Sequence, residues 1–193
     1  QMITKGFDFP GVTLAAVVLA DLGLNLPDFR SAERTFQLLT QVAGRAGRGE
    51  RAGRVLIQTY APNHYSIGAA RDQDFTRFMR RELTLRREFN YPPFCRLAMV
   101  RVEGPDGARV SRLAADAAKL LGRSAESNGI KVLGPAPAPI ERIKQRWRWQ
   151  IMLKSTAIAP LRGALGAMNS ALKPAAQRDG VFLITDIDPI RMM

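Results

Sequence analysis

The segment Arg146-Trp-Arg-Trp-Gln-Ile-Met-Leu153 is the clearest indication of how the second half of the chain folds. Side chains point alternately to the two faces of a β-strand, so both tryptophans share one face with Ile151 and Leu153, and both arginines occupy the other. Tryptophans interleaved with arginines also resemble a stacking platform for single-stranded nucleic acid. We favour a tryptophan face that packs under helices, because this face continues into aliphatic residues.

The segments around this strand predict an alternating order of strands and helices. Apolar and turn-forming residues predict strands at 97–102, 130–133 and 181–187, helices at 110–121 and 158–172, and a stiff proline-rich bend at 134–139. The resulting order is β-α-β-β-α-β. It predicts a ferredoxin-like C-terminal domain over residues 95–193, with two helices on one face of a four-stranded sheet.

Residues 1–63 predict part of an α/β layer with a parallel sheet. The apolar run at 12–19 lacks alternation, so we predict a strand buried on both faces. A helix is predicted to begin at Ser31 and to end before Gly44, and another strand follows at 54–60. Residues 64–94 are predicted to form one connecting helix and a linker, with Phe75, Met79 and Leu83 as its apolar stripe.

The composition favours a folded protein with an anionic partner. The chain has 193 residues, 46% of them apolar, with 29 Lys and Arg against 17 Asp and Glu, a net charge of +12. Such an excess concentrates polyphosphates around the surface, so nucleic acid is the leading partner, ahead of a ribosomal or membrane-surface role. No apolar run is long enough to span a membrane and no secretory signal is visible, so we expect a cytoplasmic protein.

Metal and thiol chemistry are not expected. One cysteine and one histidine cannot supply an internal disulfide or a cluster of four zinc ligands. Cys95 is predicted to pack as a small apolar side chain, and His64 to lie in a surface loop. Asp186 and Asp188 share a strand face without a third ligand, so they are predicted to end a strand.

The sharpest functional motif is Gln41-Val-Ala-Gly-Arg-Ala-Gly-Arg48, where a predicted helix ends. Arg45 and Arg48 are three residues apart, and guanidinium forks match phosphate oxygens. The glycines, Gly44 among them, let the backbone approach a ligand closely. The alternative is a solvated basic loop at a glycine-rich helix end.

The context of this motif resembles superfamily 2 helicases. Lys5-Gly-Phe-Asp-Phe-Pro10 is similar to their G-x-D-x-P element, and the motif at 41–48 to their Q-x-x-G-R-x-x-R element. Within the superfamily, the run from Asp28 to Arg48 resembles the primosomal protein N′ (PriA) family of replication-restart DNA helicases. The resemblance covers nearly the whole chain, since it continues in Tyr91-Pro-Pro-Phe, Val132-Leu-Gly-Pro-Ala-Pro-Ala-Pro, Arg146-Trp-Arg-Trp-Gln and Asp186-Ile-Asp-Pro.

The resemblance implies an ATP-dependent 3′ to 5′ DNA helicase that recognises stalled or branched forks and directs primosome assembly. This chain would hold the end of the second RecA-like lobe and the C-terminal DNA-binding domain. The implied roles are arginine fingers for Arg45 and Arg48, positioning of water or γ-phosphate for Gln41, nucleotide contacts for Gly6, Asp8 and Gly44, and DNA backbone contacts for Thr4 and Lys5.

The chain contains no G-x-x-x-x-G-K-[ST] phosphate loop, so we expect it not to hydrolyse ATP alone. The resemblance places that loop, the remaining ATP and Mg²⁺ ligands and the Zn²⁺-binding cysteines upstream, in a longer protein. Single-strand-binding protein and primosome proteins are implied partners, branched and single-stranded DNA the implied ligands, and a monomer the implied state.

A basic face is predicted on the tryptophan strand and before it. Its members are Arg142, Lys144, Arg146 and Arg148, which would bind phosphates with strong salt dependence and little sequence preference. This surface leaves a second hypothesis open, a non-catalytic nucleic-acid-binding module of ferredoxin-like fold.

Overall fold

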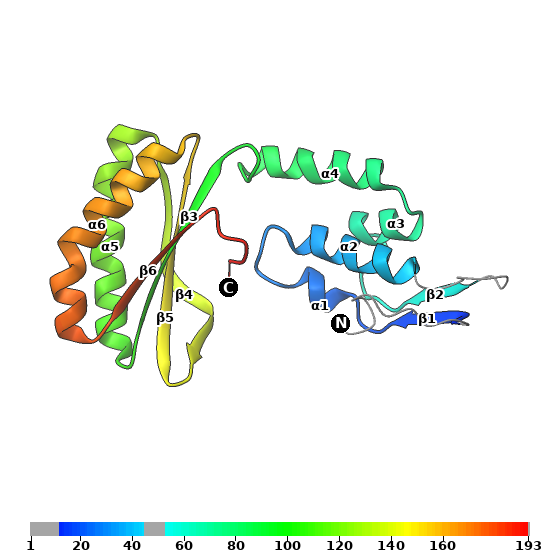
Figure 1. Cartoon of the computed structure of the whole chain (residues 1–193), viewed down its shortest axis with the longest axis horizontal. Helices are drawn as coiled ribbons and strands as arrows, with labels where there is room; N and C mark the ends of the chain where they lie inside the picture. The colour runs from blue at the N-terminus through cyan, green and yellow to red at the C-terminus, as the bar shows by residue number, and fades with distance from the viewer. Residues whose placement is uncertain (1–11, 45–52, 193) are drawn as a thin grey trace. The chain divides into compact units, whose positions relative to one another are not determined.

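The computed structural model describes residues 12–44 and 53–192, which divide into two compact units after Leu85. We describe each unit by itself (Figure 1). Among the described residues, no helix is both long and apolar enough to cross a membrane.

In its described residues, the first unit combines a two-stranded parallel sheet with four helices. Its elements are β1 (Leu14–Val17), α1 (Asp21–Leu24), α2 (Ser31–Ala43), β2 (Arg54–Ile57), α3 (Tyr65–Arg71) and α4 (Phe75–Glu88), whose last turn enters the second unit. Its core is formed by Phe36, Leu39, Ile67 and Phe78, which are almost completely buried. The predicted strand, helix and strand are therefore present, and the two strands are parallel as expected.

The burial predicted for the first strand is wrong. Leu14 is 55% exposed and Val18 is 73% exposed. Among the described residues β1 pairs with β2, and the first unit's helical core lies against alternate residues such as Val17. A strand that is apolar on both faces is fully buried only if both faces are covered, and the described residues cover one face of β1.

The predicted connecting helix is two helices. Gln73 adopts φ 52° between α3 and α4, a left-handed conformation that a continuous α-helix excludes. The buried stripe of α4 also differs from the prediction, because Phe78 and Glu82 are buried whereas Phe75 is 63% exposed. The Tyr65 hydroxyl donates to Glu82 Oε2 at 2.6 Å, which allows a carboxylate to lie inside this unit.

The second unit has the predicted order β-α-β-β-α-β. Its elements are β3 (Arg96–Gly104), α5 (Gly107–Asn128), β4 (Lys131–Ile143), β5 (Arg146–Ser155), α6 (Ile158–Asp179) and β6 (Phe182–Ile187). The strands form one antiparallel sheet in the order β4-β5-β3-β6, and both helices cover the same face of it (Figure 1). The opposite side is called the helix-free face below.

The tryptophan face packs as predicted. Ile151 and Leu153 are fully buried beneath the helices, and Trp147 and Trp149 pack against the same core. Gly107 begins α5 so close to Trp147 that an added Cβ would lie 3.2 Å from its ring. These tryptophans therefore contribute to the core, as predicted, and both stay half-buried.

The proline-rich segment is part of a strand. We predicted that the second strand ends near Leu133, but β4 continues to Ile143 with register shifts against β5 on both sides of Ala136 and Pro137. Gly134 has φ 99°, and a Cβ there would lie 2.9 Å from the Gln150 carbonyl oxygen. An edge strand tolerates prolines, because the missing N–H donors need not face a neighbour.

Candidate nucleic-acid interface

The motif that suggested phosphate binding begins at the C-terminal end of α2. Gln41 is exposed in the last turn, and the Gly44 N–H caps the helix by donating to the Thr40 carbonyl at 3.0 Å. Gly44 has φ −71°, so its backbone conformation does not require glycine. The other predicted residues of the nucleotide and DNA sites, Thr4, Lys5, Gly6, Asp8, Arg45 and Arg48, lie outside the described residues, and their roles stay predictions.

Buried polar contacts fix the N-terminal end of α2. Asp28 is 7% exposed, accepts a hydrogen bond from the Arg30 N–H at 3.0 Å and forms an ion pair of 2.8 Å with Arg34. Farther along the helix, Phe36 stacks on Phe78 with ring centroids 4.2 Å apart. The contacts of Asp28, Arg34 and Phe36 therefore fix the position of α2, the helix whose last turn contains Gln41.

Asp21 joins the ends of the two parallel strands. Its carboxylate accepts hydrogen bonds from the Thr59 hydroxyl at 2.9 Å and from the Tyr60 N–H at 3.0 Å. Burial acts to raise the pKa of Asp21, but these hydrogen bonds stabilise the charged form and lower the pKa overall. Sequence reasoning did not single out Asp21, which begins α1 four residues after Val17, the last residue of β1.

The predicted basic face on the β4–β5 hairpin is divided between two sides of the sheet. Arg142 pairs with Trp147 in register and lies over its ring at 5.2 Å, on the side that faces the helices. Lys144 is exposed in the tight turn, where Lys144 and Gln145 both have positive φ. Arg146 and Arg148 lie on the helix-free face, so the prediction that all four share one face is wrong.

Arg101, Arg146 and Arg148 form an arginine cluster around a single carboxylate, Glu103. Their Nε atoms lie 3.2, 3.7 and 3.9 Å from the Glu103 oxygens. Arg148 is only 8% exposed, and its guanidinium also donates to the Ile140 carbonyl at 3.5 Å. The sequence suggested that Arg148 lies on an open basic surface. In the structure this side chain is largely covered by β4.

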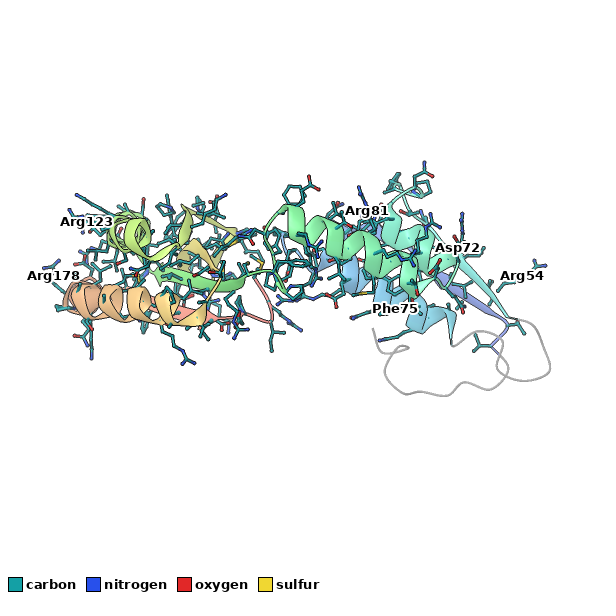
Figure 2. The ribbon with its side chains drawn as sticks, turned by 90° about the horizontal axis from the view of Figure 1, so that it is seen from above. Arg54, Asp72, Phe75, Arg81, Arg123 and Arg178 are labelled. Atoms are coloured by element: carbon teal, nitrogen blue, oxygen red, sulfur yellow. The ribbon has the colours of Figure 1, made fainter. Side chains whose placement is uncertain are left out.

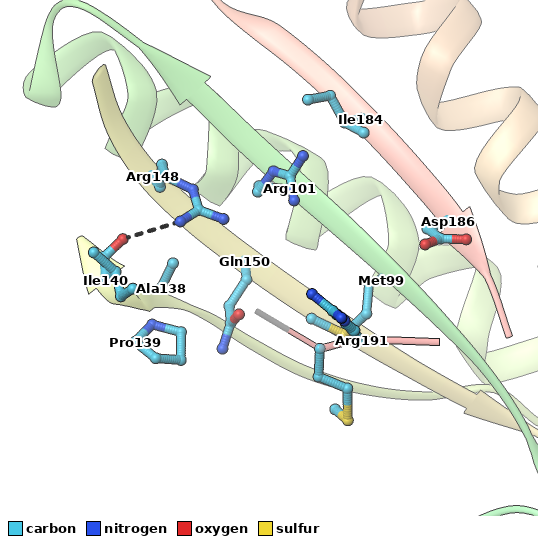
Figure 3. Close-up of a pocket in the computed structure, with 11 residues that line it drawn as sticks. Met99, Arg101, Ala138, Pro139, Ile140, Arg148, Gln150, Ile184, Asp186 and Arg191 are labelled. Carbon is cyan, nitrogen blue, oxygen red and sulfur yellow. Dashed lines mark hydrogen bonds between the residues drawn. The ribbon is translucent and has the colours of Figure 1, made fainter. Parts of the chain in front are cut away.

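A hollow lies beside this cluster on the helix-free face (Figure 3). Its polar lining comes from Arg101, Arg148, Gln150, Asp186 and Arg191, and its apolar lining includes Met99, Ile184 and Met192. Arg191 and Met192 belong to the C-terminal segment that returns after β6. The cavity volume is about 80 Å³, far below the roughly 300–1,000 Å³ of pockets that enclose a whole small molecule.

Lys154 marks the other end of the helix-free face. It is 5% exposed, donates to the Phe89 carbonyl at 2.9 Å and lies 3.4 Å from the centre of the Tyr91 ring. Burial lowers the pKa of Lys154. This lysine therefore fastens residues 89–91 to the sheet, and it is enclosed rather than available to a ligand.

Three residues to which we assigned no chemistry prove to be structural. Cys95 is buried as predicted, its thiol donates to the Asn90 carbonyl, and burial raises its pKa. His64, predicted in a surface loop, is the N-cap of α3 and accepts from the Ser66 N–H at 3.3 Å. Asp188 accepts from the Leu97 N–H at 3.3 Å and pairs with Arg96 at 3.3 Å, which ends β6.

Exposed arginines are spread over the helices of both units. Arg81 on α4, Arg123 on α5 and Arg178 on α6 point into solvent (Figure 2). On the described part of the chain, no cluster of three His, Cys, Asp or Glu side chains is arranged to hold a metal ion. On α4, Arg77, Arg80 and Arg81 line one open surface hollow together.

Comparison with known proteins agrees with the resemblance seen in the sequence. A family model described as primosomal protein N C-terminal domain matches residues 87–190. The chain is 44% identical over 193 residues to replication restart protein PriA of Bacillus subtilis, 42% over 190 residues to that of Synechocystis and 37% over 193 residues to that of Treponema pallidum. It covers 100%, 98% and 100% of its own length in these matches but 24%, 22% and 29% of theirs, so it spans about a quarter of these relatives.

Among solved structures, the de novo designed protein Foldit4 matches with a TM-score of 0.38 and 11% identity, over 50% of this chain and 99% of the Foldit4 chain. This TM-score is too low to inform the fold. The family model, in contrast, matches more than half of the chain and coincides with the second unit. The chain belongs to the primosomal protein N C-terminal domain family.

Proposed function

We propose that the chain is the rear part of a replication-restart DNA helicase that recognises stalled or branched forks and directs primosome assembly. The observation that carries this proposal is the match of the whole chain to proteins named replication restart protein PriA. The net charge of +12 supports DNA as the ligand, because a basic surface gains affinity when phosphates release their counterions.

The first unit is proposed to belong to the second RecA-like lobe of an ATP-driven 3′ to 5′ motor. Parallel strands joined through a helix support this assignment, and so does the placement of Gln41 at the exposed end of a firmly held α2. Arg45 and Arg48 then act as arginine fingers on ATP bound with Mg²⁺, with Gly6, Asp8 and Gly44 near the nucleotide and Thr4 and Lys5 on the DNA backbone. The phosphate loop and the zinc-binding cysteines belong to the preceding part of the longer protein.

The second unit is proposed to be a ferredoxin-like DNA-binding domain. The element order β-α-β-β-α-β and the strand order β4-β5-β3-β6 support this fold, since the first strand lies between the last two. Among the phosphate contacts predicted in this unit, Arg142 and Lys144 are exposed. Single-strand-binding protein and primosome proteins are proposed as partners of a monomer in the cytoplasm.

The motor role is tested by Arg48→Ala in the full-length protein. We expect DNA-stimulated ATP hydrolysis to fall on the order of 10³-fold or more, because an arginine finger stabilises charge that develops in the transition state. Fork binding, measured by fluorescence anisotropy, is expected to stay near normal.

Arg54→Ala is the matched control, since Arg54 is an exposed arginine at the start of β2 (Figure 2). Near-normal hydrolysis by Arg48→Ala would reject the motor role and favour a module that only binds nucleic acid. Equal losses in both variants would show that any lost charge in this unit slows the motor.

A further inference from the structure

The arginine cluster on the helix-free face has too few acceptors for its donors. Cross-strand pairing sets Glu103 opposite Arg148 and Arg101 opposite Gln150, so these side chains project from the same face of neighbouring strands. One carboxylate is shared by three guanidinium groups, which leaves this part of the sheet with an excess of two positive charges.

Two atoms of the cluster are buried without a hydrogen-bond acceptor. They are the Nε atoms of Arg101 and Arg146, for which the described residues offer no acceptor of suitable geometry. Both atoms lie within ion-pair distance of the Glu103 carboxylate, at 3.2 and 3.7 Å, but without hydrogen-bond geometry, so Glu103 offsets their charge without satisfying their N–H groups. Because these Nε atoms are enclosed, an oxyanion in the hollow is reached by the terminal guanidinium nitrogens instead. Arg101 and Arg148 both line the hollow described above (Figure 3).

The lining of the hollow favours an anion of small size. Three arginines and one aspartate contribute to it, and Gln150 adds an amide donor. Guanidinium forks bind tetrahedral oxyanions through paired hydrogen bonds. A volume of about 80 Å³ admits one such group and excludes a nucleotide.

We propose that the helix-free face carries a subsite for one backbone phosphate of a single-stranded nucleic acid, held by Arg101 and Arg148 with Gln150 and Arg191 beside them. The proposal rests on the proposed DNA-binding function and assigns one contact of it to a defined place. It also explains why a guanidinium as buried as that of Arg148 has, among the described residues, a shared carboxylate and one carbonyl as its partners.

An exposed aromatic ring next to the cluster favours a single strand over a duplex. Phe182 pairs with Glu103 across β3 and β6, is 56% exposed, and has the Arg146 guanidinium over its ring at 4.3 Å. A ring in this position offers a surface on which an unpaired base stacks while its phosphate enters the hollow. A base within a duplex is already stacked on its neighbours, so it is not available to stack on the Phe182 ring.

The test measures binding of the chain to an oligothymidylate of about 12 nucleotides, a length within the site sizes typical of single-strand binders. Arg101→Gln is expected to weaken binding about tenfold at low salt, and to reduce the slope of log K against log salt by about 0.7, the value for one lost phosphate contact on a single strand. Arg123→Gln, which removes an exposed arginine from α5, is expected to change neither the slope nor the affinity appreciably.

A second measurement separates the sources of the oxyanion. Inorganic phosphate is titrated into the labelled chain while the arginine Nε–Hε NMR signals are followed, and the Arg101 signal is expected to shift. Arg148→Lys keeps the charge but removes the fork, so it is expected to weaken both phosphate and oligothymidylate binding. Circular dichroism confirms that each variant is folded.

The outcomes distinguish this proposal from the proposed function. If the chain binds oligothymidylate but Arg101→Gln and Arg123→Gln behave alike, the subsite is refuted and DNA binding stands. If phosphate shifts the Arg101 signal but the chain binds no oligonucleotide, the nucleic-acid source is overturned together with the DNA-binding role. If phosphate leaves the signal unchanged, the cluster is a structural ion-pair group and the proposal fails.

Discussion

Replacing Glu103 by glutamine tests how the arginine cluster is stabilised. The change keeps the size of the side chain but removes the charge shared by Arg101, Arg146 and Arg148. Breaking a buried ion pair costs roughly 3–5 kcal/mol, and partly exposed pairs add roughly 0.2–1 kcal/mol each. The buried pair to Arg148 is 3.9 Å long, so we expect the lower end of the range, about 3 kcal/mol.

The assay is thermal unfolding of the chain at pH 7, followed by circular dichroism. A loss of 1 kcal/mol lowers the Tm of a domain of about 100 residues by roughly 4–8 °C, so Glu103→Gln is expected to lower the Tm by roughly 12 °C or more. Glu141→Gln is the matched control, because Glu141 is an exposed glutamate on β4, an outer strand of the same sheet. A Tm within about 2 °C of the unchanged chain, less than the shift for 1 kcal/mol, would refute the view that Glu103 holds the cluster.

Phosphate in the buffer adds a second comparison to this experiment. An oxyanion that enters the hollow supplies acceptors to the same arginines, and ligand binding to the folded state raises its stability. Phosphate is therefore expected to raise the Tm of the Glu103→Gln variant by more than it raises the Tm of the Glu141→Gln variant. An equal increase of the Tm in both variants would show a general salt effect on the folded chain.

Two further predictions concern the backbone of β4 and the cap of α3. Gly134→Ala is expected to destabilise the second unit by about 2–4 kcal/mol in chemical unfolding, because φ is 99° and the new Cβ would lie 2.9 Å from the Gln150 carbonyl oxygen. Gly129→Ala is the control and is expected to cost about 1 kcal/mol, because Gly129 has φ 62° but no atom within 4 Å of the new Cβ. Equal losses of stability in the two variants would contradict the clash at Gly134. Burial lowers the pKa of His64 below its usual 6.5, so its contribution to stability is complete above pH 6.5 and is lost as the pH falls through the lowered value. His64→Asn, which retains a capping acceptor, should lose this part of the pH dependence of the Tm, and an unchanged profile would contradict the cap's role.

The second unit was largely predictable because its strands and helices have clear periodicity. Strict alternation in β5 correctly placed Trp147 and Trp149 against the core. The proline-rich segment was misjudged, since prolines indicate a bend in isolation but are compatible with an edge strand once β5 supplies the pairing. Local sequence does not show which neighbour a segment will find.

The first unit was less predictable because its strands depend on what covers them. The apolar run at β1 predicted burial on both faces, yet Leu14 is half exposed. The end of α3 was hidden for a different reason. Gln73 adopts a left-handed conformation that its residue type does not announce, so a helical period through residues 65–90 indicated one helix where there are two.

The candidate site shows the limit of assigning charges to faces by alternation alone. Alternation placed Arg146 and Arg148 together correctly, but it could not show that β4 covers Arg148 or that Glu103 approaches both from the next strand. Arg142 was misplaced because the register shifts of β4 put it opposite Trp147. Long-range pairing, rather than residue type, sets the accessibility of each guanidinium.

The prolines of β4 also govern how the sheet can associate with other chains. β4 and β6 are its two outer strands, and β4 lacks the N–H groups of Pro135, Pro137 and Pro139. A strand without these donors is a poor template for edge-to-edge aggregation. Any extension of the sheet by a foreign strand is therefore directed to the β6 border, and the hairpin side is protected from it.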